Sequence, residues 1–166
     1  MRNPKSLPAP FPAKISTAKT VLESIQNCIK EMKDNWKKIR AFNVSDKGAK
    51  PMYDLKAIYK RNVVLEDQII NLKLYSICIN LGFKSINQIP KESSFPTIYV
   101  LSQLKSRKEN LLTIGTKFNS KTETIVLNKK FIEKEIKTLD KAIIKCESEL
   151  TEFNKLASLS VYQAAA

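Results

Sequence analysis

The chain has 166 residues, of which 43% are hydrophobic, 27% are charged and only three are glycine, and its formal net charge is +13. This hydrophobic content speaks against a wholly disordered chain, and the scarcity of glycine speaks against a sheet or a site built on tight loops. The composition therefore favours long helices, and the charge favours an acidic or phosphate-rich partner.

The N-terminal segment carries prolines at four of its first twelve positions. Because proline fixes φ and lacks an N–H group, residues 1–19 are predicted to form an extended Pro-rich arm. The basic residues of this segment would also suit an organelle transit segment, although its prolines disfavour the amphipathic helix of such a segment. The helical body is expected at residues 20–157, followed by a flexible tail at 158–166.

The first helix is predicted from Thr20 to about Phe42, because Thr20 and Glu23 have the spacing of a capping box. Its second half reads KDNWKKIR. Basic side chains around an aromatic ring can neutralise phosphates and stack on bases. The candidate nucleic-acid-binding residues are Lys33, Trp36, Lys37, Lys38 and Arg40. The structural alternative places the tryptophan in the core and the lysines in solvent.

The second helix is predicted from about residue 52 to Leu81, after a break at 43–51, with Gly82 just past its C-terminal end. Two apolar stripes run along it, so it is expected to lie between two other helices. Asn62 interrupts one stripe. It is either a buried polar residue that fixes the helix register or a solvent-exposed one.

The third helix is predicted to follow a loop at 84–96 and to end at Gly115. Ser120 and Glu123 again have capping-box spacing, which predicts a fourth helix at 122–157. At 1.5 Å per residue this helix is about 54 Å long. It exceeds the other helices in length, and apolar side chains left in water would cost about 1.5–3 kcal/mol each.

The apolar stripe of the fourth helix has heptad spacing and is therefore expected to bind a helix of another molecule. The predicted partner-binding residues are Ile132, Ile136, Leu139, Ile143, Leu150 and Phe153.

The sequence contains little that indicates catalysis. It has no histidine, its three glycines are far apart, and its carboxylate pairs have the spacing of solvent-facing helix positions. The cysteines, Cys28, Cys78 and Cys146, are odd in number and widely spaced, which indicates reduced, buried thiols. We expect no enzyme activity, no metal site and no cofactor, and no hydrophobic run has the length of a membrane span.

Two stretches resemble small helical proteins of bacteriophages and their bacterial hosts. They are YDLKAIYKRNVVLEDQIINLKL at 53–74 and YVLSQLKSRKENLLTIGTK at 99–117. Proteins of this kind carry a helix of the L-K-x-x-Y-x-x-R-x-x-L-x-x-Q-I-x-x-L-K type and then a helix with an L-x-x-L-K run. The resemblance implies an assembly or virion-associated role.

The sequence thus predicts an all-α protein, an elongated bundle of three to four helices with a long C-terminal coiled-coil helix. The predicted function is a non-catalytic structural or assembly role, in the cytoplasm or in a virion. The expected partner is a second copy or a helical protein of a larger complex. The alternative is a helical protein whose lysine-rich face binds nucleic acid or an acidic partner.

Overall fold

The structure is a computed structural model that describes the backbone of residues 18–164 and the side chains of residues 18–156. The predicted N-terminal arm lies almost entirely outside this range. The elements in chain order are α1 (Ala18–Phe42), β1 (Val44–Asp46), α2 (Leu55–Leu81), the 3-10 helix η1 (Ile86–Gln88), α3 (Phe95–Leu112), β2 (Glu123–Ile125) and α4 (Lys129–Ala164). The prediction of an elongated helical bundle with a long C-terminal helix is confirmed.

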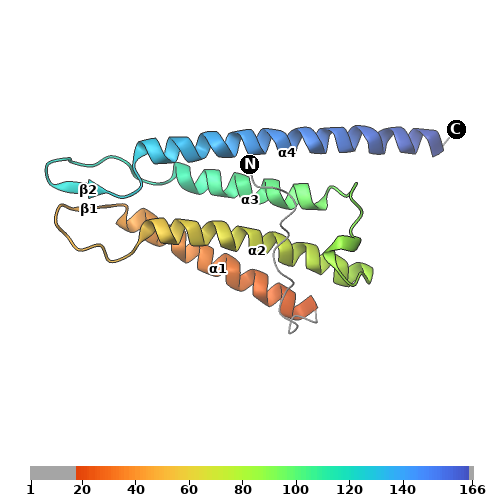
Figure 1. The fold of residues 1–166 in the computed structure, drawn as a ribbon, viewed down its shortest axis with the longest axis horizontal. Helices are drawn as coiled ribbons and strands as arrows, with labels where there is room; N and C mark the ends of the chain where they lie inside the picture. The colour runs from red at the N-terminus through yellow and green to blue at the C-terminus, as the bar shows by residue number, and fades with distance from the viewer. Residues whose placement is uncertain (1–17, 165–166) are drawn as a thin grey trace.

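Successive helices run in opposite directions along the long axis of the molecule (Figure 1). α1 packs mainly on α2, and α3 packs mainly on α4, so the body consists of two antiparallel helix pairs. α2 contacts both α1 and α3. This confirms the central position that its two apolar stripes predict. The two short strands lie together at one end of the body (Figure 1).

The ends of α2 are set by local sequence. The Asp54 carboxylate accepts a hydrogen bond from the backbone N–H of Ala57 at 2.9 Å, which caps the N-terminus. At the other end, Gly82 has φ 71°, and the N–H of Phe83 donates to the Cys78 carbonyl at 2.8 Å. Residues with a Cβ atom are strained in this left-handed conformation, whereas glycine adopts it readily. The predicted C-terminal end of α2 is therefore confirmed.

The start of α4 differs from the prediction, because residues 123–125 form a strand instead of a first helical turn. β2 pairs antiparallel with β1, and Val44 lies opposite Ile125. The Glu123 carboxylate accepts from the backbone N–H of Asn119 at 2.6 Å, so it stabilises a turn and not a helix cap. The helix cap is Asn128, whose side-chain oxygen accepts from the N–H of Phe131 at 2.9 Å.

A single asparagine connects the two loops that carry the strands. Asn43 is 1% exposed. Its amide nitrogen donates to the carbonyls of Gly115 and Leu127, at 2.9 and 3.1 Å, and its amide oxygen accepts from the N–H of Leu127 at 2.8 Å. These bonds join backbone groups more than seventy residues away to the end of α1. The long-range bonds, together with the β-branched run Thr124, Ile125 and Val126, favour a strand at 123–125 over a helix.

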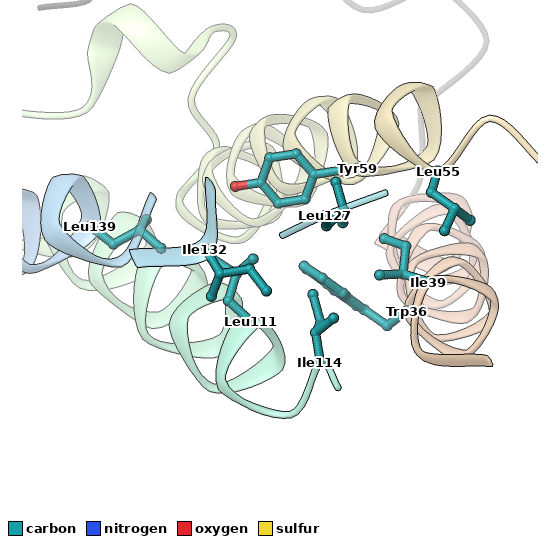
Figure 2. Packing of buried hydrophobic residues seen from close by; sticks show 9 residues of the cluster. All are labelled: Trp36, Ile39, Leu55, Tyr59, Leu111, Ile114, Leu127, Ile132 and Leu139. Carbon is teal, nitrogen blue, oxygen red and sulfur yellow. The ribbon is translucent and has the colours of Figure 1, made fainter. Parts of the chain in front are cut away.

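The main core lies beside the sheet, where all four helices converge. Figure 2 shows Trp36 and Tyr59 reaching inward from α1 and α2 toward Leu111, Leu127 and Ile132. The rings of Trp36 and Tyr59 meet edge to face, with centroids 6.0 Å apart. A smaller cluster of Met32, Leu65 and Ile69 continues between α1 and α2. Farther from the sheet, α4 packs on α3.

Candidate partner-binding groove

The first half of the predicted partner-binding stripe on α4 is covered by the chain itself. Ile132, Leu139 and Ile143 are only 6%, 4% and 8% exposed. Ile136 is half-buried and packs against the main core. This corrects the sequence interpretation for Ile132, Leu139 and Ile143, which belong to the interior of the protein, while Ile136 is covered in part by the same chain.

Near the sheet the cover is the main core, and along the rest of the covered stripe it is α3, which runs antiparallel to α4. The Lys108 ammonium lies 2.6 Å from the Asp140 carboxylate, and Lys105 lies 2.8 Å from Glu147. These ion pairs flank the contact between the two helices and agree with one register. Sequence periodicity identifies an apolar stripe but does not say which helix covers it.

The second half of the stripe borders an open groove of about 590 Å³. Leu150 and Phe153 are half-buried there, and Leu156 is 65% exposed. The wall opposite α4 is formed by the segment that leads into α3 and by its first turn. The lining residues are Lys91, Glu92, Ser93, Ser94, Thr97, Lys145, Ser148, Glu149, Leu150, Glu152, Phe153 and Leu156.

α4 extends beyond the first turn of α3 (Figure 1). The Thr97 hydroxyl donates to the Glu149 carboxylate at 3.5 Å, which fixes the register between the two helices. α3 begins two residues before Thr97, and α4 continues for fifteen residues after Glu149, to Ala164. About 20 Å of α4 therefore projects past α3. This helical projection includes most of the predicted tail at 158–166.

The rim of the groove carries charges of both signs. Lys145 lies 3.9 Å from Glu149, and both side chains are more than half exposed. Lys91, Glu92 and Glu152 complete the rim. Exposed pairs of this kind contribute only about 0–1 kcal/mol to stability. They are therefore free to form new pairs with a bound molecule at little cost.

The predicted nucleic-acid-binding residues on α1 do not form one exposed face, because the tryptophan is buried while the basic side chains lie at or near the surface. Trp36 is 3% exposed and packs in the main core, as in the structural alternative, so its ring is not presented to a base. Lys33 and Lys37 are exposed. Lys38 is half-buried over the ring of Tyr53.

The remaining residue of this face, Arg40, is exposed and bonded within the chain. Its guanidinium donates to the side chains of Asn110 and Thr113, at 3.1 and 3.4 Å. It therefore ties the end of α1 to the end of α3.

A line of polar side chains is buried inside the bundle. Glu66 on α2 is 2% exposed, and its two carboxylate oxygens share the Nε–H group of Arg107 on α3, at N···O distances of 2.8 and 3.0 Å. The Nη2 atom of Arg107 donates a further hydrogen bond to the same carboxylate. Asn62 is fully buried and its Oδ1 atom accepts from the Asn35 amide at 2.8 Å. Asn62 is therefore the buried polar residue of the two alternatives, and it links α1 to α2.

The ionisable groups of this interior are bound to one another. Burial alone would lower the pKa of Arg107, but the hydrogen bonds and charge of Glu66 outweigh it and raise that pKa. The Tyr59 hydroxyl donates to the Glu135 carboxylate at 2.6 Å. Burial first, and this bond second, raise the Tyr59 pKa well above its usual range. The arrangement ties α2 to α3 and to α4 through side chains that are bonded within the chain.

The three cysteines are free thiols. Burial is the main cause that raises the pKa of Cys28, Cys78 and Cys146, so they are mostly protonated and weakly nucleophilic at neutral pH. Among the described residues no group of three or more candidate ligands could hold a metal ion. Over the same part of the chain, no helix combines the length and apolarity that a membrane crossing requires.

No protein-family model matches the chain, and no curated protein or solved structure shows significant similarity to it.

Proposed function

We propose that the protein is a non-catalytic structural protein that assembles by binding a helix in the groove between α4 and the first turn of α3. The observation that carries this proposal is the groove itself, whose apolar side, formed by Leu150, Phe153 and Leu156, continues onto a projecting helix. Helix-in-groove binding uses apolar residues at such spacings of three and four. Covering each large side chain is worth about 1.5–3 kcal/mol.

The occupant that the groove favours is α4 of a second copy. In a two-fold pair the same patch meets itself, so it must carry charges of both signs to be self-complementary. The rim satisfies this condition, since lysines 91 and 145 alternate with glutamates 92, 149 and 152. The segment 135–156 contains four basic and five acidic residues. Its near-neutral balance removes the repulsion that a strongly basic surface would cause.

The non-catalytic part of the proposal is supported by the lack of histidine in the sequence and by the mutual neutralisation of the buried ionisable groups. The free cysteines suit a reducing compartment such as the cytoplasm. A place in a virion or another large complex is the role that the resemblance to small phage proteins supports.

The test compares two substitutions on the same helix. Leu156 lines the groove and is 65% exposed, while Ile144 lies outside the groove and is 62% exposed. We expect Leu156→Asp to raise the dimer Kd at least tenfold, since it removes an apolar contact worth about 1.5 kcal/mol or more. Ile144→Asp should change it less than about twofold, because a solvated surface residue contributes little. Because both residues are exposed in the single chain, neither change should unfold it.

Sedimentation equilibrium of the full chain over a range of protein and salt concentrations measures the dimer Kd of the wild type and of both variants. A dimer that persists at high salt and is weakened selectively by Leu156→Asp supports the proposal. A wild-type protein that stays monomeric at every concentration would refute the second copy as occupant. Equal weakening of the dimer by both substitutions would show that the groove is not part of the interface.

A further inference from the structure

The fold concentrates positive charge at the end of the body that carries the sheet. Residues 33–60 contain eight basic and three acidic side chains, and residues 113–134 contain five and two. The first segment spans the end of α1 and the start of α2, and the second leads from α3 into α4, so both lie at this end (Figure 1). We call it the basic end. It carries a net charge of +8 out of the +13 of the whole chain.

The two segments are held together by direct bonds. β1 pairs with β2, and the backbone N–H of Lys47 donates to the Thr122 carbonyl at 2.7 Å. The Lys47 ammonium also donates to the Ser120 carbonyl at 3.3 Å. Together with the bonds of Asn43, these contacts fix the two loops relative to each other. The basic end is therefore an ordered surface and not a pair of independent loops.

Most of the acidic residues of the basic end are engaged locally, and Glu133 pairs with Lys129 at 3.7 Å. Asp34 pairs with Lys37, and Asp54 caps α2. Glu123 accepts from a backbone N–H group.

Several lysines at the same end remain available. Lys50, Lys117 and Lys121 are exposed, and none of the three forms an ion pair with any described residue. The loops therefore present ammonium groups to solvent without local neutralisation.

We propose that the basic end binds the phosphate backbone of duplex nucleic acid without sequence preference. Lysine contacts phosphate as a point charge, whereas specific recognition of base edges relies on the bidentate arginine fork. The only arginine in these two segments is Arg40, and its guanidinium is bonded to Asn110 and Thr113. The burial of Trp36 removes the aromatic ring of the predicted nucleic-acid-binding face from contact with bases. Phosphate contact is the mode of binding that the exposed lysines offer.

A lipid surface fits this end less well. Its apolar side chains mainly face the core, and the exposed ones include Met52 and Phe118, which stand on separate loops. Scattered apolar residues do not form the apolar face that inserts into a membrane. Binding to anionic vesicles is therefore the competing outcome of the experiment.

The experiment measures binding of the full chain to two fluorescent DNA duplexes of unrelated sequence, at several salt concentrations. The test variant is K50Q/K117Q/K121Q. The control variant is K19Q/K84Q/K141Q, which removes the same charge from exposed lysines outside the basic end. Circular dichroism on both variants checks that the helices are retained. Vesicles of phosphatidylcholine and phosphatidylserine provide the competing surface.

We expect equal affinity for the two duplexes and a linear fall of log K with log salt concentration. The test variant should bind at least tenfold more weakly, with a salt slope shallower by about 2–3, since each lost phosphate contact removes about 0.9. The control should stay within about threefold of wild type. Equal weakening by both variants, a strong sequence preference, or binding to the vesicles alone would overturn the proposal. None of these results depends on the Leu156 interface, so this proposal and the assembly function fail separately.

Discussion

The buried ion pair between Glu66 on α2 and Arg107 on α3 allows a direct test of how burial determines the contribution of an ion pair to the free energy of unfolding. Arg107→Met removes the guanidinium and leaves the Glu66 carboxylate, which is 2% exposed, without its charged partner. Breaking a buried pair in this way costs about 3–5 kcal/mol, because the remaining charge stays desolvated. Total stability is about 5–15 kcal/mol for a domain. The single substitution should therefore remove a large fraction of it.

The matched control is Arg61→Met. Arg61 also binds a carboxylate through Nε and Nη2, that of Glu31, at 2.7 and 3.1 Å, but the two side chains are 47% and 43% exposed. The hydrogen-bond geometry is thus similar, and burial differs. Water screens the exposed pair, so its loss should cost about 0.2–1 kcal/mol.

Urea denaturation followed by the fluorescence of Trp36, the single tryptophan, reports both changes. At a slope of about 2 kcal/mol per M, Arg107→Met should lower the midpoint by roughly 2 M and Arg61→Met by less than about 0.5 M. The double variant E66L/R107M should recover most of the loss, because it removes both charges. Equal, small shifts for the two arginine substitutions would refute the reasoning, and so would a double variant as unstable as Arg107→Met.

Three further changes test the fold. Asn43→Ala should cost about 2–4 kcal/mol in urea denaturation, because it leaves backbone groups of Gly115 and Leu127, in the segment between α3 and α4, without partners. A loss below about 1 kcal/mol would contradict the linking role. Gly82→Ala should destabilise the protein by about 1 kcal/mol in thermal denaturation, because Gly82 has a left-handed φ of 71° that a side chain disfavours. Gly115→Ala should be neutral or stabilising in the same measurement, because Gly115 has no positive φ and open space around its Cβ position. The hydrogen bond from Arg61 lowers the pKa of Glu31, so this pair contributes stability above the ordinary carboxyl range and loses it as the pH falls through the lowered pKa. Glu31→Gln should therefore reduce stability slightly at neutral pH, by less than about 1 kcal/mol, and not at about pH 2; an equal effect at both pH values would speak against the pair.

The local features of the chain are well predicted from its sequence. The periodicity of α2 identifies its two packing faces, and Gly82 marks its C-terminal end, because both depend on residues within a few turns of one another. The heptad stripe of α4 is also recognised correctly as apolar and helical. The start of α4 is missed, since the Ser120–Glu123 spacing resembles a capping box while the strand is stabilised by residues near Asn43.

The sequence by itself determines that the chain forms long helices, that it is strongly basic and that α4 carries an apolar stripe which another surface must cover. Only the tertiary structure decides that the chain's own main core and α3 cover Ile132, Leu139 and Ile143, which leaves the groove near Leu150 as the open part. It also decides that the lysines of residues 33–60 and 113–134 share one end. The physical reason is that helix formation depends on neighbours three and four residues apart, whereas burial and electrostatic fields depend on contacts across more than seventy residues of chain.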